Sequence, residues 1–402
     1  MRFEGVRKLG FNMWLDRVTG KKQNMVTLNL SGPPGIGKTA VGHAIAADMQ
    51  AWVNANGDLA RKVGLTGKAA VEVQDLTSSL PEDLGGVPLP TGKHDDEVGV
   101  PILSYALQDW MVRMMRPGAF GVLILDDLPA AMPAIQAAVR KLVLARAVHG
   151  HEISPYVFLI VTGNRRQDGA GASTLPSHFR NAVMTVTIDP WLPTWIKWYG
   201  AQEGLDPIVP AFLQTVNGLT HFSQLPDKAS KDEGAFATPR TWALLGQEFR
   251  TAENSGELLS AAHGLVGDSA VEFLAFKEIK SQLVSPERVL LDPQGALPNP
   301  ERQLDTPDKA VAMVTGIAEH AVAWLKGNDT HRRSIANERF LLALAWTVQG
   351  KNGEHVATCV HHFDALGGNP EDLVEVVGKH ATNEHVRNLI LRLKKLFKNR
   401  ES

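Results

Sequence analysis

The sequence predicts an α/β fold with a parallel sheet flanked by helices up to about residue 190, and helical regions from there to the end. Two observations predict this fold class. Short β-rich apolar runs alternate with helical stretches in the first part of the chain, as in an α/β layer built on a parallel sheet. After Asp189 the β-branched runs disappear, and prolines punctuate segments with helical spacing.

Four apolar runs are predicted to be buried strands. They cover residues 26–30, 122–125, 157–161 and 183–188, and each is rich in Val, Ile, Leu or Thr. The first three end at polar or glycine-containing segments. Because ligands bind outside the carboxyl ends of parallel strands, we expect the chemistry of this protein to lie there.

Length and composition narrow the class of protein. The chain has 402 residues, enough for two or three domains. Its 41 Lys and Arg residues against 43 Asp and Glu residues leave a formal charge of −2, so general coating of nucleic acid is not expected. The single cysteine, Cys359, excludes an intramolecular disulfide and a cysteine-based zinc site. No apolar stretch approaches roughly 18 residues, so we expect a soluble, cytoplasmic protein without membrane contact.

The strongest motif is a glycine-rich segment between the first predicted strand and a helical stretch. It reads Gly32, Pro33, Pro34, Gly35, Ile36, Gly37, Lys38 and Thr39, followed by Ala40 in the helix, and matches the phosphate-binding pattern GxxxxGK[ST]. Glycines let backbone N–H groups turn toward a phosphate, and the helix N-terminus adds partial positive charge. Lys38 is expected to bridge the β- and γ-phosphates of ATP, and Thr39 to place its hydroxyl on Mg²⁺.

A second motif is the acidic pair Asp126-Asp127, which follows the apolar run 122–125 directly. Asp126 is expected to hold Mg²⁺ through water, and Asp127 to orient or deprotonate the attacking water. A pair of acids after a strand can also be an ordinary turn. The glycine-rich motif upstream favours the functional interpretation.

Together with three later motifs, these residues resemble the AAA+ ATPases, and within them most of all the MoxR group of the helix-2-insert clade. The later motifs are the strand 158–161 leading to Thr162-Gly163-Asn164, the segment 175–180, and Thr238-Pro239-Arg240. The resemblance covers about residues 20–260. It implies a P-loop AAA+ core over residues 1–190 and a small all-helical lid over 191–262, with 263–402 as a helical C-terminal extension beyond the match.

The resemblance also implies roles for single residues. Asn164 falls on sensor 1, the polar side chain between the acidic pair and the γ-phosphate. Arg180 falls on the arginine finger that completes a neighbouring subunit's site, although Arg165 or Arg166 could take this role and Arg180 could be a plain surface residue. Arg240 falls on sensor 2, which reaches the nucleotide from the lid; the alternative is a helix N-terminal arginine without a ligand.

One residue departs from the family pattern. The family usually has Glu where this chain has Asp127, and the shorter side chain withdraws the carboxylate from the attacking water by one methylene. Positioning errors near about 1 Å can cost around a hundredfold in rate. We therefore expect slow or partner-activated hydrolysis.

The interval from Lys38 to Asp126 is longer than one helix and one strand require. Its segment 78–92 has too much Pro and Gly for a helix interior. In the family resembled, this interval holds the helix-2 insert and loops that face the pore of the ring. Residues 84–89 are therefore a candidate segment for gripping a client, and a solvated loop that shields the nucleotide is the other interpretation.

Aromatic and histidine clusters give weaker signals. Trp191, Trp195 and Trp198 have helical spacing that predicts a packing face, with a client-binding stripe as the alternative. His149 and His151, on either side of Gly150, are not predicted to form a metal site.

The resemblance implies an ATP hydrolase that uses Mg²⁺ and works between the subunits of a homo-oligomeric ring, expected to be a hexamer. Its role would be to remodel or mature a protein partner, and MoxR proteins point to a partner with a von Willebrand A domain. Two alternatives stay open. One is an ATP-gated scaffold that hydrolyses very slowly, and the other is an AAA+ motor on nucleic acid, which the near-neutral charge disfavours.

Overall fold

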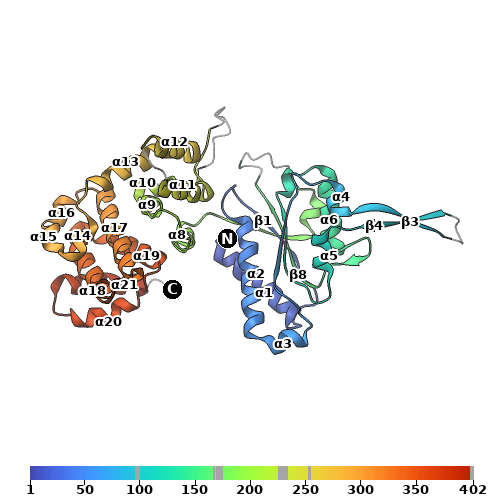
Figure 1. The fold of residues 1–402 in the computed structure, drawn as a ribbon, viewed down its shortest axis with the longest axis horizontal. Helices are drawn as coiled ribbons and strands as arrows, with labels where there is room; N and C mark the ends of the chain where they lie inside the picture. Colours follow the sequence, from blue (N-terminus) through green and yellow to red (C-terminus); the bar gives the residue numbers. More distant parts are fainter. Residues whose placement is uncertain (96–99, 166–167, 169–174, 225–233, 252–254, 399–402) are drawn as a thin grey trace. The chain divides into compact units, whose positions relative to one another are not determined.

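A computed structural model describes residues 1–95, 100–165, 168, 175–224, 234–251 and 255–398 of the chain. The chain forms two compact units, Met1–Pro190 and Trp191–Ser402. They are named the N-terminal unit and the C-terminal unit (Figure 1).

The N-terminal unit is built on a five-stranded sheet in which every pairing is parallel. Its strands are β1 Thr27–Ser31, β2 Ala70–Asp75, β5 Phe120–Asp126, β8 Tyr156–Gly163 and β9 Val183–Thr187, in the order β2-β5-β8-β1-β9. The four predicted strands are all present. The edge strand β2 was not predicted, because its sequence AVEVQD alternates charged with apolar residues and stays partly exposed.

Helices cover both faces of this sheet (Figure 1). They are α1 Phe3–Val18, α2 Lys38–Ala55, α3 Gly57–Lys62, α4 Pro81–Gly85, α5 Asp109–Met115, α6 Pro133–Ala145 and α7 Ser177–Arg180, with a 3-10 helix η1 at Leu128–Ala130. Alternate residues of β5 enter two separate cores: Val122 and Ile124 pack with α1 and α2, and Leu123 and Leu125 pack with α5 and α6. Burial on both faces explains why β5 reads as a continuous apolar run. The predicted α/β core, with a parallel sheet flanked by helices, is confirmed.

Two β-hairpins extend this unit. The first pairs β3 Val87–Asp95 with β4 Val100–Ala106, and it projects away from the sheet (Figure 1). The second is short and pairs β6 Ala147–Val148 with β7 His151–Glu152, directly before β8. The candidate client-gripping segment 84–89 thus forms the end of α4 and the start of β3.

The described part of the C-terminal unit is helical, as predicted. Its helices are α8 Leu192–Gly200, α9 Ile208–Leu213, α10 Val216–Thr220, α11 Pro239–Thr251, α12 Ser255–Val266, α13 Ser269–Gln282, α14 Pro286–Leu291, α15 Pro293–Ala296, α16 Pro300–Gln303, α17 Pro307–Lys326, α18 Thr330–Thr347, the 3-10 helix η3 Gly350–His355, α19 Val356–Ala365, α20 Asp372–Lys379 and α21 Glu384–Lys398. One buried core joins α8, α9, α11 and α13 with Ala312 of α17 and Ala365 of α19. Helices on both sides of residue 262 therefore share a core, and the division into lid and extension there stays a prediction.

Only Trp195 of the predicted tryptophan packing face packs into this core. Its indole Nε1 donates a hydrogen bond to the Pro239 carbonyl over 3.1 Å. Trp191 and Trp198 are 40% and 48% exposed. No helix among the described residues is both long and apolar enough to cross a membrane.

Candidate nucleotide-binding site

Sheet topology brings three predicted motifs to the same edge. Strand β8 lies between β1 and β5 and pairs with both. Because all three strands are parallel, the segments that follow them emerge side by side. The glycine-rich motif follows β1, the acidic pair ends β5, and Asn164 follows β8.

Left-handed glycines shape the loop after β1. Gly35 and Gly37 have φ angles of +71° and +90°, which L-residues with a side chain adopt only at a cost. Gly37 directly precedes α2, whose first residue is Lys38. The first N–H groups of a helix lack intrahelical partners, so this end of α2 favours an anion such as a phosphate.

Lys38 is held inside the loop that it follows. Its side chain is 8% exposed, and Nζ donates hydrogen bonds to the carbonyls of Gly32 (3.1 Å) and Pro33 (2.8 Å) and to Asn164 Oδ1 (2.7 Å). A buried ammonium is costly without oxygen partners. These oxygens fix the charge of Lys38 at the position where the motif needs it.

Asn164 connects Lys38 to the acidic pair. Its Oδ1 accepts from Lys38, and its Nδ2 donates to Asp127 Oδ1 over 3.4 Å. The ammonium and the carboxylate together settle which way the amide points. Asp127 itself has a left-handed backbone, with φ of +55°, at the sharp turn into η1. The structure therefore brings together Lys38, Asn164 and Asp127 as the motifs predict.

Asp126 lies between two hydroxyl groups. Thr39 Oγ1 lies 3.1 Å from Asp126 Oδ2 and 3.3 Å from Oδ1, and Thr162 Oγ1 donates to Oδ1. A hydroxyl and a carboxylate side by side are oxygen ligands of the kind that Mg²⁺ prefers. The residues predicted for Mg²⁺, Thr39 and Asp126, thus fit such an ion in chemistry and in place.

Thr162 was not predicted as a functional residue. Its side chain is completely buried, and its hydroxyl donates to Asp126 while accepting from the backbone N–H of Asp127 over 3.2 Å. One hydroxyl therefore orders both acidic residues. The signal available in the sequence was a single hydroxyl residue within the apolar run of β8.

Close packing fixes the end of β8 against η1. A Cβ built on Gly163 would lie 2.3 Å from Pro129 Cδ, so only glycine lets the strand approach the turn that follows the acidic pair. This contact sets the spacing between Asn164 and Asp127.

The arginines predicted for the site differ in their surroundings. Arg165 pairs with Asp168, with Nε 2.8 Å from Oδ2, and this hydrogen bond raises the pKa of the Arg165 guanidinium. Arg180 is exposed at the end of α7, and its side chain has no ion pair with the described residues. Arg166 lies outside the described residues. Arg240 is exposed in the first turn of α11 in the C-terminal unit, and its role stays a prediction.

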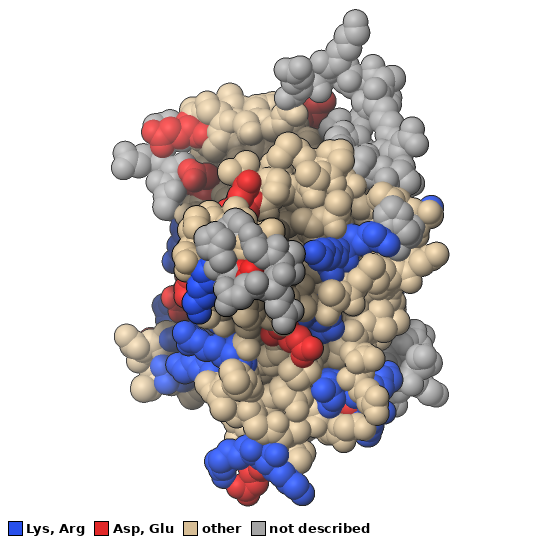
Figure 2. Space-filling model, turned by 90° about the vertical axis from the view of Figure 1, so that its right-hand side faces the viewer, with Lys and Arg blue, Asp and Glu red and all other residues tan. Residues whose placement is uncertain are grey.

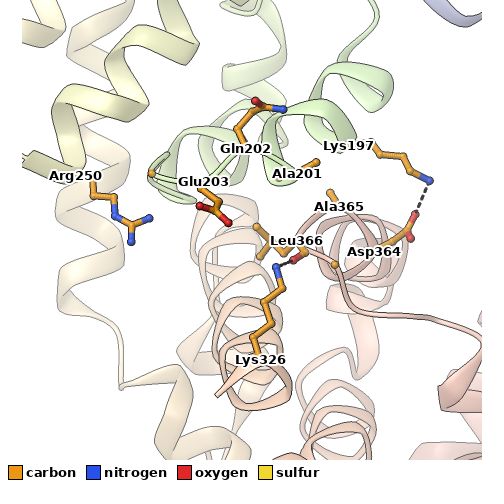
Figure 3. Close-up of a pocket in the computed structure, with 12 residues that line it drawn as sticks. Lys197, Ala201, Gln202, Glu203, Arg250, Lys326, Asp364, Ala365 and Leu366 are labelled. Carbon is orange, nitrogen blue, oxygen red and sulfur yellow. Dashed lines mark hydrogen bonds and ion pairs between the residues drawn. The ribbon is translucent and has the colours of Figure 1, made fainter. Parts of the chain in front are cut away.

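A separate pocket of about 600 Å³ lies in the C-terminal unit (Figure 3). Lys326 donates to the Leu366 carbonyl over 2.6 Å at its wall, and Lys197 lies 4.0 Å from Asp364. Figure 3 shows Arg250 from α11 across the view from Lys197 and Asp364, with the Glu203 carboxylate between Arg250 and Lys326. Charges of both signs line it, and no sequence motif had pointed to these residues.

Comparison with known proteins gives remote similarity only. No protein-family model and no curated protein matches the chain. The chain is similar to the Thermotoga maritima RuvB Holliday junction branch migration motor, with 14% identity, a TM-score of 0.36, and 71% of this chain and 76% of that chain covered. It is also similar to NtrX from Brucella abortus in complex with ADP (14% identity, TM-score 0.32, 89% of this chain, 68% of that chain). A third similar structure is C. elegans PCH-2 (15% identity, TM-score 0.32, 70% of each chain).

Likeness at this level assigns no function. The chain's own strand order and the convergence of its motifs define a P-loop fold of the AAA+ type.

Proposed function

We propose that the chain is a Mg²⁺-dependent ATP hydrolase of the AAA+ class that works in a ring and remodels or matures a protein partner, in the manner of the MoxR group. One observation carries the proposal. Asn164 joins Lys38 to Asp127 by hydrogen bonds, beside the Thr39–Asp126 contact, at the edge of the sheet where α2 begins.

Each side chain has a defined part in the proposed reaction. Lys38 binds the β- and γ-phosphates, and the backbone N–H groups of the loop orient them. Thr39 and Asp126 hold Mg²⁺, which when bound supplies positive charge against the phosphate oxygens. Asp127 orients the attacking water and accepts its proton, and Asn164 keeps that carboxylate directed toward the phosphate site.

Arg180 is the residue that supports the proposal of a site shared between subunits. It is an exposed cation on a short helix of the N-terminal unit. An arginine supplied by a neighbouring subunit neutralises charge that develops on the transferred phosphoryl group. A homo-oligomeric ring, expected to be a hexamer, would place this residue at the next subunit's nucleotide.

The β3–β4 hairpin is the feature that supports the proposal of a protein partner. Large apolar side chains on both of its strands are exposed: Val87 by 45%, Leu89 by 49%, Ile102 by 40% and Leu103 by 56%. Exposed apolar surface of this kind marks protein contacts. By resemblance to MoxR proteins, we propose a partner with a von Willebrand A domain.

Charge distribution disfavours a nucleic-acid motor. Figure 2 shows lysine and arginine side chains interrupted by acidic and uncharged ones on the face that it draws, rather than one basic stripe. The formal charge of −2 agrees with this. A salt-dependent shift of the protein on DNA would favour the nucleic-acid alternative.

Particle mass by light scattering and phosphate release test the proposal together. We expect ATP to drive assembly, Lys38→Ala to abolish nucleotide-dependent assembly, and Arg180→Ala to assemble but lose turnover. Arg116→Ala, another exposed arginine of the same unit, is the matched control and should behave as wild type. If wild type neither assembles nor releases phosphate with ATP, even beside its partner, the proposal fails.

A second candidate, an ATP-gated scaffold, is favoured by Asp127. Its side chain is one methylene shorter than the Glu that is usual in the family resembled, which limits its reach toward an attacking water. The Asp127→Glu variant distinguishes the scaffold from the partner-remodelling hydrolase. A scaffold should release phosphate faster with the longer side chain, whereas a hydrolase that already works with Asp127 should change little or lose the coupling of hydrolysis to its partner.

A further inference from the structure

His149, in the turn between β6 and β7, contacts the base of the β3–β4 hairpin. Its ring stacks on Tyr105, with ring centroids 3.6 Å apart and planes inclined by 8°. Its Nε2 lies 2.6 Å from the Gly85 carbonyl oxygen. A carbonyl only accepts, so Nε2 carries the proton of this hydrogen bond. One side chain therefore holds both the strand β4 and the segment that enters β3.

The backbone of this turn is shaped for the contact. His149 has a φ of +48°, a left-handed conformation that costs free energy in a residue with a side chain. Such strain persists where surrounding contacts repay it. The stack on Tyr105 and the bond to Gly85 are contacts of this kind.

The β3–β4 hairpin is anchored to the remainder of the N-terminal unit mainly at its base. Leu84, at the end of α4, is 3% exposed and lies in the same core as Ile135 and Val139 of α6. Farther along the strands, Leu89 and Leu103 are about half exposed. The direction of the hairpin is therefore set where Leu84 and His149 hold it.

A continuous segment joins this anchor to the candidate nucleotide site. Asp127 leads into η1, η1 into α6, and α6 into β6 and the turn with His149. Between α6 and β6, Arg146 Nη2 donates to the Val157 carbonyl over 2.6 Å, which ties the end of α6 to β8. The turn with His149 is thus connected to α6 through a residue that also contacts β8.

We propose that His149 and Tyr105 are positioning residues that fix the direction of the β3–β4 hairpin and transmit nucleotide-dependent movement of α6 to it. This inference rests on the proposed function, because the movement requires a nucleotide beside Asp127. It adds to that function a route from the site of hydrolysis to the exposed apolar strands.

Spin labels on two introduced cysteines measure the direction of the hairpin. Lys93→Cys places one label on β3, and Lys62→Cys places the other at the end of α3, both at exposed positions. The chain's single cysteine, Cys359, is completely buried, and burial raises the pKa of its thiol, so it does not react with the label. The distance distribution between the labels is recorded with ADP and with a non-hydrolysable ATP analogue.

In the otherwise wild-type labelled protein, we expect a narrow distribution whose mean differs between ADP and the analogue. His149→Ala and Tyr105→Ala each remove the stack, which shifts the balance toward an undocked hairpin by roughly two- to tenfold. Their distributions should broaden and lose the nucleotide-dependent difference. Tyr105→Phe keeps the ring and should match wild type, as should His151→Ala, the control on the neighbouring strand.

The outcomes that overturn the proposal are distinct from those that overturn the proposed function. Nucleotide affinity is measured on the same samples. If nucleotide binds but the wild-type distances do not change, or if both alanine variants keep the narrow, nucleotide-dependent distribution, the transmission role is wrong while the nucleotide site stands. If no nucleotide binds, both fail together.

Discussion

Replacing Thr162 by valine removes the hydroxyl that orders both acidic residues while keeping the shape of the side chain. The wild-type hydroxyl donates to the Asp126 carboxylate and accepts from the Asp127 N–H. A hydrogen bond to a charged group contributes about 1.5–3 kcal/mol, and a polar group left without a partner costs about 1–3 kcal/mol. Both acids are partly exposed, so water can replace some of this loss. We expect the N-terminal unit to lose about 2–3 kcal/mol of its free energy of unfolding.

Urea titration with hydrogen-exchange mass spectrometry measures this loss on peptides from β5 and β8, which report the N-terminal unit separately. Thr162→Ser is the matched control because it keeps the hydroxyl and loses only a methyl group, at a cost of about 1 kcal/mol. Calorimetric titration of the folded variants with Mg²⁺ and ATP should show weaker binding for the valine variant than for the serine variant. A valine variant within about 0.5 kcal/mol of wild type, or a serine variant equally destabilised, would refute the assigned role of the hydroxyl.

Three further substitutions test other contacts. Lys38→Ala should abolish ATP binding, seen as loss of calorimetric heat. Asn164→Ala should keep ATP binding but lower phosphate release roughly a hundredfold, because the Asp127 carboxylate loses the hydrogen bond that orients it. In the C-terminal unit, Lys280→Met should cost about 3–5 kcal/mol in urea unfolding at pH 7, since Glu319 would lose the ammonium 2.8 Å away. Burial alone raises the pKa of Glu319, but attraction to Lys280 and the nearby His362 outweigh it and lower the pKa from 4.5 to about 2. Wild type should therefore lose stability as the pH falls from about 4.5 to 2, and the Lys280→Met variant, which keeps only His362 beside Glu319, should show a smaller loss.

Motifs that act through local backbone shape could be predicted from the sequence. The loop before Lys38 and the acidic pair at Asp126 each follow an apolar strand directly, so their placement needs only the rule that parallel strands share a carboxyl edge. Asn164 followed from the same rule. Its amide meets both Lys38 and Asp127 because β8 lies between β1 and β5.

Contacts that depend on side-chain partners could not be predicted in this way. The sequence does not indicate the pairing of Arg165 with Asp168 or the two hydrogen bonds of Thr162, since hydroxyl and charged residues are common at strand ends. The stretch 291–300 contains three prolines, yet short helices form there. There Asp292 and Asn299 accept hydrogen bonds from Gly295 and Arg302 as N-caps, and each is followed by proline at the first helical position.

The order of strands in the sheet has a consequence for synthesis on the ribosome. Among the strands of the sheet β1 is made first, yet within the described residues it pairs with β8 and β9, with Leu28 opposite Ile160 and Met184. The roughly 130 residues between Leu28 and Ile160 take about 7–25 s to make at typical translation rates. During that interval β1, the apolar strand that precedes the phosphate-binding loop, has no sheet partner, while β2 and β5 can already pair. The oldest strand of this sheet is among the last to be enclosed.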